Sequence, residues 1–253
     1  MTDHNGIALI TGGSGGIGAA IARELSESGK GVAFTYLRNR EKAEALAEEL
    51  CKAGGVAIAI ELDLRDDEAV STTVDQLAKD HDGIHSLVTA HGPFIEMVHM
   101  SNLTPKLLRE TFESDTFAAY NVIHAAIPHL RKTKGAMVAI TTAALGRYAS
   151  TDILSVGPKS AIETFARGVA VEEGKFGVRA NAVGVGLLED GMFGPLVNAG
   201  SFNQKFLEKS RENIALRRFG KSTEVAKLVR FLLSEDSSFV TGQHIMADGG
   251  YAV

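Results

Sequence analysis

The stretch that most constrains this chain is IALITGGSGGIG at residues 7–18. Residues 7–10 form a short apolar run of the length of a buried strand, and residues 11–18 form a tight glycine-rich turn. Residues 19–28 then carry the apolar pattern of a helix, and Gly29 is a suitable stop. The stretch therefore predicts a strand, a glycine turn and a helix in direct succession.

This succession predicts a phosphate site. The first N–H groups of a helix have no partner within the helix, and the helix dipole is positive at that end. Glycines let a pyrophosphate approach these groups closely, and Gly13, Gly15 and Gly18 have the GxGxxG spacing of dinucleotide-binding turns. The alternative is a glycine-rich turn that binds no ligand.

Charge and cysteine content narrow the class of protein. A net charge of −5 over 253 residues gives no electrostatic case for binding nucleic acid. No apolar run reaches the ~18 residues that span a membrane, and the polar residues 1–6 do not form a signal peptide. Cys51 is the single cysteine, which excludes an intrachain disulfide and a cysteine-based zinc site. We expect a cytoplasmic protein without a bound metal and without nucleic acid or membrane partners.

Apolar runs alternate with amphipathic stretches along the rest of the chain. The expected strands lie at residues 32–36, 56–62, 84–90, 136–141, 178–183 and 244–247, and the expected helices at 40–53, 66–81, 105–131, 159–174 and 223–234. Such alternation is typical of right-handed βαβ units and a parallel sheet. We predict an α/β fold: one Rossmann-like domain over residues 1–253, with a doubly wound parallel sheet of about seven strands and helices on both faces.

One long irregular stretch, residues 184–203, interrupts this alternation. A loop of that length in a compact domain is usually functional, so we expect a lid over the substrate site at about residues 185–212. The alternative is a plain surface insertion. Its large apolar residues include Met192, Phe193, Leu196 and Phe202. They favour an apolar small-molecule substrate.

The segment after the second expected strand distinguishes two dinucleotides. An NAD site has Asp or Glu there, which accepts from the ribose hydroxyls, but this chain has no acid before Glu41. Arg38 is placed to meet a 2′-phosphate, because a guanidinium suits phosphate geometry. We expect NADP(H) as the cofactor, with NAD(H) as the alternative in which Arg38 and Arg40 are only the solvated start of a helix.

The glycine turn also fits a longer pattern. Thr11, Gly12, Gly16, Ile17 and Gly18 satisfy TGxxxGIG, and in this the chain resembles the short-chain dehydrogenase/reductase superfamily, with 3-oxoacyl-acyl-carrier-protein reductases among its members. The resemblance covers nearly the whole chain and includes residues 220–224 and 241–250. It implies hydride transfer between a nicotinamide and a carbonyl or alcohol.

The resemblance also implies cofactor contacts and an assembly. It places Asp63 beside the adenine, although a turn residue or helix N-cap is the alternative. The positions that match cofactor-binding residues are Gly12, Ser14, Gly15, Gly16, Ile17, Gly18, Tyr36, Arg38, Asp63, Leu64, Ala90, Gly92, Lys159, Gly186 and Leu188. Members are usually dimers or tetramers, so we expect a homodimer or homotetramer. The apolar face of residues 121–130 fits such an interface or the core.

The chain keeps only part of the family's catalytic set of Tyr, Lys, Ser and Asn. Lys159 matches the Lys that holds the nicotinamide ribose, but the Tyr four residues earlier is Ser155, whose aliphatic hydroxyl is a much weaker acid than a phenol of pKa ~10. Pro158 indicates a helix start, which would leave Ser155 in a loop. Thr142 matches the Ser and keeps a hydroxyl, or caps a strand end, and Asp115 matches the Asn.

Three side chains are candidates for the missing proton donor. His91 follows a strand, and a histidine side chain usually titrates near neutral pH. The alternative is a histidine that packs under a loop. Tyr148 lies eleven residues before Lys159, on a loop that can cover the site. The alternative is that it is a half-buried aromatic side chain of that loop. Asp152 lies seven residues before Lys159, at the position where enoyl reductases of the superfamily carry a Tyr. The alternative is that Asp152 is a solvated acid in a loop. Asp190 lies near the position at which the family often has a Thr over the carboxamide of the nicotinamide.

The phosphate and ribose end is intact in this sequence, whereas the proton-transfer end is changed. We predict an NADP(H)-dependent oxidoreductase of the short-chain dehydrogenase/reductase type with an atypical proton donor. Its substrate is a carbonyl or alcohol, or a conjugated enoyl compound, because some dienoyl-CoA reductases of the superfamily also carry Ser at the Tyr position. The alternative is a nucleotide-binding protein without redox turnover, such as a sensor or partner subunit.

Overall fold

The computed structural model describes residues 6–190 and 204–253. Seven parallel strands form one sheet in the order β3-β2-β1-β4-β5-β6-β7. The strands are β1 (Ile7–Thr11), β2 (Val32–Tyr36), β3 (Ala57–Glu61), β4 (Ile84–Thr89), β5 (Ala136–Thr142), β6 (Arg179–Val185) and β7 (His244–Ala247). The predicted doubly wound sheet is confirmed. Its strand order reverses between β1 and β4, which is where such folds bind their ligands.

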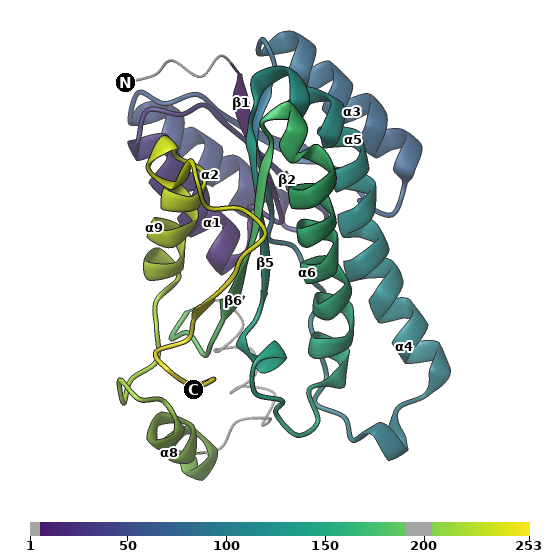
Figure 1. Ribbon diagram of the computed structural model, residues 1–253, viewed down its shortest axis with the longest axis vertical. Coiled ribbons are helices and arrows are strands. Elements are labelled where there is room, and N and C mark those ends of the chain that lie inside the picture. Colours follow the sequence, from purple (N-terminus) through teal and green to yellow (C-terminus); the bar gives the residue numbers. More distant parts are fainter. Residues whose placement is uncertain (1–5, 191–203) are drawn as a thin grey trace.

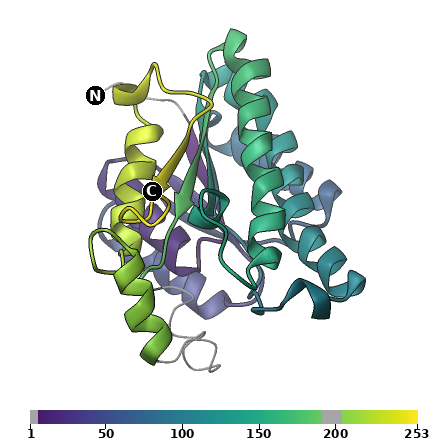
Figure 2. The same cartoon turned by 60° about the horizontal axis from the view of Figure 1, so that its bottom comes forward.

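Helices cover both faces of the sheet (Figure 1). One layer contains α1 (Gly16–Glu27), α2 (Arg40–Lys52) and α9 (Ser222–Leu232), and the other contains α3 (Asp67–Asp80), α5 (Ala118–Thr133) and α6 (Ile153–Glu173). Two further helices are α4 (Pro105–Phe112) and α8 (Gln204–Asn213). Figure 2 brings forward the end of the molecule where the strands terminate, and α8 lies at this end.

The alternation of side chains along β1 divides the core between the two layers. Ile7 and Leu9 pack with α3, α5 and α6, whereas Ala8 and Ile10 pack with α1, α2 and α9. All four are buried, as expected for a strand in the middle of a parallel sheet that is covered on both faces. The two faces of β1 therefore each contribute to one half of the core.

Two expected helices differ from the observed ones. Residues 105–131 do form a continuous helical rod, but a π-helical turn, η2 (Glu113–Phe117), joins α4 to α5. The expectation that a helix starts near Pro158 is wrong, because α6 begins at Ile153 and contains Pro158 in its interior. The residue before a proline normally clashes with it in a helix, and Gly157 reduces that clash because it has no Cβ.

The apolar face of residues 121–130 belongs to the core. Val122, Ile123, Ala126 and Leu130 are buried against the sheet and the neighbouring helices. Of the two readings that the sequence left open for this face, the structure therefore supports packing within the chain. The surface of this layer carries other apolar side chains instead, among them Tyr120, which is 48% exposed.

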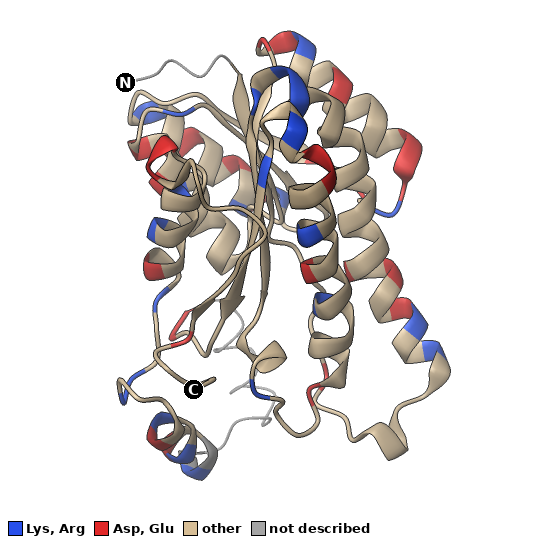
Figure 3. Cartoon of the chain, viewed as in Figure 1, with Lys and Arg blue, Asp and Glu red and all other residues tan. Residues whose placement is uncertain are grey.

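Charged residues of both signs are spread over the helices, and the strands in this view carry few of them (Figure 3). Among the helices of the described residues, none is both long and apolar enough to span a bilayer. Residues 191–203, the tip of the expected lid, lie outside the described residues, and they include Met192, Phe193, Leu196 and Phe202. The lid therefore stays a prediction.

Candidate functional site

The carboxyl ends of the strands lie at one edge of the sheet, the lower end in Figure 1. Five strands each have a predicted site position at their last residue or shortly after it, and these positions thus meet at this edge. They are Gly12 after β1, Arg38 after β2, Ala90 after β4, Thr142 at the end of β5 and Gly186 after β6. The fold therefore brings together positions that are up to 174 residues apart, from Gly12 to Gly186.

The glycine turn between β1 and α1 is shaped by close backbone contacts. Gly12 has a φ of +69°, and a Cβ there would lie 2.7 Å from the Cα of His91. A Cβ on Gly18 would lie 2.4 Å from the carbonyl oxygen of Gly12. α1 begins at Gly16, three residues before the predicted helix start, so the turn leads directly into free helix N–H groups. This arrangement fits the pyrophosphate of a dinucleotide.

The end of β2 carries two arginines in different situations. The Arg40 guanidinium forms ion pairs with Glu61 and Glu44. Arg38 is exposed and has no ion pair within the described part of the chain. The guanidinium of Arg38 is therefore available to a 2′-phosphate, whereas that of Arg40 is already engaged.

Asp63, after β3, is held by a neighbour. Its carboxylate accepts from Arg65 Nε at 2.9 Å and from the Arg65 backbone N–H at 3.0 Å. These hydrogen bonds to Arg65 keep the pKa of Asp63 below its usual value. The next residue, Leu64, is buried, and its carbonyl oxygen accepts from Asn121 Nδ2 at 3.0 Å. The contact of Asp63 with adenine stays a prediction.

Lys159 and Asp115 meet at the other half of the site. The Lys159 ammonium donates to Asp115 Oδ1 at 2.7 Å and to the His91 carbonyl oxygen at 3.1 Å. Asp115 lies in the π-helical turn with no exposed side-chain surface, and its Oδ2 is buried without a partner in the described residues. Sequence reasoning placed Lys159 and Asp115 in the site but missed both the π-helical turn and their direct ion pair.

His91 does not fit the predicted role of proton donor. Its Nε2 lies 3.3 Å from the Asp115 carbonyl oxygen and its Nδ1 lies 2.7 Å from Thr11 Oγ1. Burial, aided by the positive charge of Lys159, lowers the pKa of His91 to about 4. The carbonyl can only accept, so Nε2 carries the single proton of a neutral ring, and the ring positions the ends of β1 and β4.

The two hydroxyl positions are both near α6. Ser155 lies in the first turn of α6 and not in a loop, which corrects the expectation from Pro158. The Thr142 hydroxyl oxygen accepts from the Ala144 backbone N–H at 3.2 Å and so caps the short turn η3 (Ala143–Leu145). This bond uses the Thr142 oxygen as an acceptor and leaves its O–H free to donate.

The remaining candidate donors differ in exposure. The side chain of Tyr148 is 52% exposed on the loop between η3 and α6. Asp152 is the residue before α6, and burial raises the pKa of its carboxyl to about 6. Asp152 is therefore only partly exposed, unlike the solvated loop acid of the alternative interpretation.

Asp190 has a structural role at the start of α9. Its Oδ1 accepts from the Ser222 backbone N–H at 3.0 Å and from the Ser222 hydroxyl at 2.8 Å. Asp190 therefore holds the first turn of α9, and its place near the carboxamide of the nicotinamide stays a prediction. Nearby, a Cβ on Gly186 would lie 2.7 Å from the Cα of Asp248, so the turn at residues 248–250 approaches the backbone of Gly186 closely.

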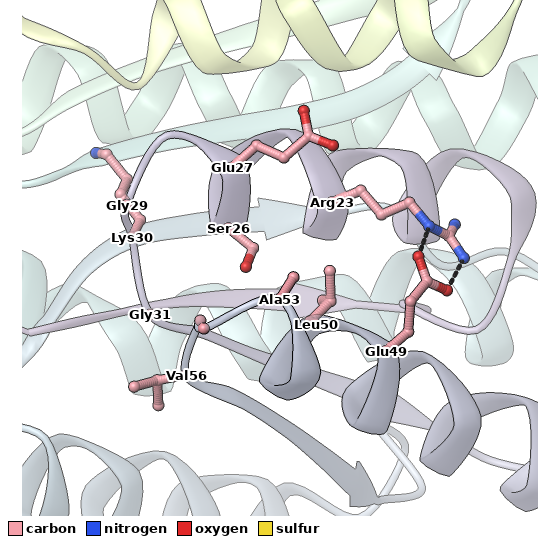
Figure 4. Close-up of a pocket in the computed structure, with 12 residues that line it drawn as sticks. Arg23, Ser26, Glu27, Gly29, Lys30, Gly31, Glu49, Leu50, Ala53 and Val56 are labelled. Carbon is pink, nitrogen blue, oxygen red and sulfur yellow. Dashed lines mark hydrogen bonds and ion pairs between the residues drawn. The ribbon is translucent and has the colours of Figure 1, made fainter.

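A cavity of about 340 Å³ lies at the opposite edge of the sheet, before β2 and β3 (Figure 4). The ends of α1 and α2 line it, and Arg23 in its wall is bound by Glu49 through two hydrogen bonds. This cavity is separate from the candidate site, because doubly wound sheets bind ligands at the carboxyl ends of their strands. No group of His, Cys, Asp and Glu within residues 6–190 and 204–253 is arranged to hold a metal ion.

Comparisons with known proteins cover nearly the whole chain. Residues 12–252 match the family model described as Enoyl-(Acyl carrier protein) reductase. The versicolorin reductase stcU of Emericella nidulans is 30% identical over 250 residues, which cover 96% of this chain and 94% of that protein. The 3-oxoacyl-(acyl-carrier-protein) reductase FabG of Staphylococcus aureus is 29% identical over 250 residues, or 96% of each chain.

Solved structures extend the comparison to the fold. A short-chain dehydrogenase from Burkholderia cenocepacia J2315, in complex with NADP, has a TM-score of 0.87 and 30% identity over 98% of both chains. The fold and the glycine turn define a Rossmann-like protein of the dinucleotide-binding class. Within that class, the chain belongs to the short-chain dehydrogenase/reductase superfamily and is an oxidoreductase of that type.

Proposed function

We propose that this protein is an NADP(H)-dependent oxidoreductase that acts on the carbonyl or alcohol, or on the conjugated enoyl group, of an apolar small molecule. The observation that carries the proposal is Lys159, whose ammonium is held at the same sheet edge as the glycine turn. Two of its N–H bonds are engaged with Asp115 and His91, and the third is left for a ribose hydroxyl.

The cofactor is assigned from the positions along this edge. The turn from Gly12 to Gly18 would hold the pyrophosphate, Arg38 the 2′-phosphate and Lys159 the nicotinamide ribose. The bound NADP of the Burkholderia cenocepacia relative supports this assignment. Reduced NADP supplies a hydride when bound, and the protein must then orient the substrate and supply a proton.

Thr142 is the group that we assign to the substrate oxygen. Its O–H is free to donate, because the bond to Ala144 uses its oxygen only as an acceptor. A hydroxyl that binds the oxygen stabilises the negative charge that forms there during reduction. Ser155 offers a second hydroxyl on α6, but it is too weak an acid to replace a phenol.

We also propose that the protein is a homodimer or homotetramer. Exposed apolar side chains on the α5 and α6 layer support this, since Phe117 is 50% exposed, Tyr120 48% and Val171 82%. A surface of this kind favours a protein partner.

A second candidate function is nucleotide binding without redox turnover. The observation that favours it is the charge balance at Lys159, because Asp115 already neutralises the ammonium that would otherwise acidify a neighbouring proton donor. In that case the protein would bind the dinucleotide but would not oxidise NADPH.

A substrate screen tests the first function against the second. Ketones and conjugated enoyl thioesters are incubated with NADPH, and its absorbance loss is followed for the wild type and for Lys159→Ala. We expect turnover on one of the two substrate classes and at least a hundredfold loss in the variant. Nucleotide binding without any Lys159-dependent turnover would support the second function.

A further inference from the structure

Reduction by this site requires a proton donor that the family's usual tyrosine does not provide. His91 holds its one ring proton in a bond to a backbone carbonyl, and Ser155 is an aliphatic alcohol. We propose that Asp152 is the catalytic acid of this protein and donates the proton to the substrate oxygen. The inference rests on the proposed reductase function and names the group that completes it.

Asp152 lies directly before α6, on the same face of the helix as Lys159. Its carbonyl oxygen accepts from the backbone N–H groups of Ser155 at 3.0 Å and Val156 at 2.9 Å, so Asp152 is in register with the helix. Residues three, four and seven positions apart share one helix face, so Asp152, Ser155 and Lys159 lie in a row. The Lys159 ammonium reaches Asp115 and the His91 carbonyl from this face, which therefore faces the site.

Helix geometry gives the order of the side chains along this row and the separation between its ends. A rise of 1.5 Å per residue separates the Cα atoms of Lys159 and Asp152 by about 10 Å along the helix axis. Helical side chains lean toward the N-terminus, so that of Lys159 leans toward Ser155. Asp152 thus lies beyond Ser155, on the side of the row away from the ribose position.

The segments around Asp152 enclose it. The Val98 backbone N–H donates to the Thr151 carbonyl oxygen at 3.1 Å, which ties the long loop after β4 to the start of α6. On the other side, η3 packs against α6 directly after Thr142. The loop after β4 therefore reaches the residue directly before Asp152, and the turn that follows Thr142 contacts the same helix.

The Asp152 carboxyl has no structural task at this position. An aspartate before a helix normally accepts from a backbone N–H of the first turn, as Asp66 does from Ala69 at 2.9 Å before α3. Asp152 makes no such side-chain bond, and no ion pair of Asp152 is present in the described residues. A half-buried carboxyl without a partner in the described residues, in a row with Lys159, is available to a ligand.

Burial supports this role. It raises the pKa of Asp152 to about 6, whereas the other described carboxyls with a resolved shift have lowered pKa values. The titratable groups on the adjoining segments are Glu96, His99, Arg147 and Tyr148. Burial is the cause of the shift, with no contribution from these groups. A carboxyl with a pKa near neutrality suits general acid catalysis.

The step balances with the reductant of the proposed function. The hydride, with its two electrons, forms the new C–H bond at the electrophilic carbon. The π bond breaks and its electron pair moves to the oxygen, or through the conjugated system to it. The O–H bond of Asp152 then breaks as the substrate oxygen takes the proton, and the carboxylate that remains regains a proton from water. In the direction of alcohol oxidation the carboxylate acts as the base.

The first test measures the pKa of the Asp152 carboxyl and does not require a substrate. Carbon-13 NMR of carboxyl-labelled aspartate is recorded against pH for the wild type and for Asp152→Asn, and the missing signal is assigned to Asp152. We expect a titration midpoint near pH 6. A midpoint below pH 4.5 would overturn the inference, whether or not a substrate has been found.

The second test measures the reaction with the best substrate of the screen. For the wild type, kcat/KM for reduction should fall tenfold per pH unit above pH 6, because the acid form is lost. Asp152→Asn should lose about 10²- to 10³-fold at pH 6 together with this pH dependence. Asp152→Glu should recover part of the rate, and the Kd for NADPH should not change in either variant.

A matched control is Asp236→Asn, which changes an exposed aspartate in the turn after α9 and should leave rate and pH profile unchanged. If Asp152→Asn keeps the wild-type rate and pH profile, the inference is overturned and the proposed function stands. If the wild type has no turnover on any substrate, the proposed function fails, and the inference fails with it.

Discussion

Lys159 and Asp115 form the most buried ion pair among the described residues, with 12% and 0% of their side chains exposed. A buried pair of this kind loses much solvation, and its worth depends on further hydrogen bonds. Lys159 has one, to the His91 carbonyl oxygen, but Asp115 Oδ2 has none in the described part of the chain. At the scale of the residue, the pair thus reduces the stability that burial would otherwise give, and a bound ligand can supply the hydrogen bond that Asp115 Oδ2 lacks.

Removing one partner of this pair should destabilise the fold strongly. Asp115→Ala leaves a buried ammonium without its counter-ion, and we expect a loss of about 3–5 kcal/mol in the free energy of unfolding by urea. The double variant Asp115→Ala/Lys159→Met should lose less than the sum of the single variants, with a coupling energy above about 1 kcal/mol. Additive losses would show that the two charges do not stabilise each other.

The sequence predicted the residues of the site better than their roles. Gly12, Arg38, Thr142 and Lys159 were all placed correctly at one edge, because each stands at a fixed distance from a recognisable strand or helix. The hydrogen-bond partners of His91 and Asp190 were not predicted. Both depend on neighbours more than 20 positions away, which periodicity and spacing along the chain do not reveal.

Three elements show how local sequence signals fail or succeed. Pro158 normally marks a helix start, but tertiary packing keeps it inside α6, where Thr116 Oγ1 donates to its carbonyl oxygen at 3.3 Å. The π-helical turn around Asp115 has no signal in the apolar pattern. In contrast, α9 begins at Ser222, within one residue of the predicted start.

The start of α9 carries a testable electrostatic contact. Glu224 accepts from the Lys221 backbone N–H at 2.9 Å and from both terminal nitrogens of Arg218, and these bonds, Arg218 first, lower its pKa to about 2. A lowered pKa stabilises the fold above the unfolded value of ~4.3, and this is lost as the pH falls toward 2.

Glu224→Gln should therefore remove an acid-sensitive part of the stability. We expect a loss of about 1 kcal/mol at pH 7, kept small because the side chain is half exposed, and no difference from the wild type near pH 2. Urea unfolding between pH 2 and 7 measures this. A loss that is equal at all pH values would contradict the ionic account. Glu68→Gln, which changes an exposed glutamate in the first turn of α3, is the control for general charge effects.

For the whole molecule, the alternation of strands and helices was enough to predict the fold. The parallel order of the sheet follows because the inner strands β1, β2 and β4 are buried along their whole length and a helix connects each strand to the next. Assembly is harder to predict from sequence, because the apolar face of residues 121–130 is in the core, while exposed apolar side chains lie elsewhere on the layer.

The proposed homo-oligomer predicts an effect at this layer. Tyr120 is 48% exposed and its ring lies 5.3 Å from that of Phe165, so Tyr120→Glu would place a charge on an interface formed by α5 and α6. Sedimentation velocity should show a dimer or tetramer for the wild type and smaller species for the variant. Lys42→Glu, on the exposed side of α2 in the opposite layer, should not change the assembly. A monomeric wild type would contradict the proposal.

The most direct test of the account is the binding of the two dinucleotides to the wild type and to Arg38→Ala, measured by isothermal titration calorimetry. The account predicts micromolar binding of NADPH, at least tenfold tighter than NADH, because the Arg38 guanidinium meets the 2′-phosphate. It predicts that Arg38→Ala loses this preference and keeps the affinity for NADH. Absence of heat with both dinucleotides, or an unchanged preference in the variant, would contradict it.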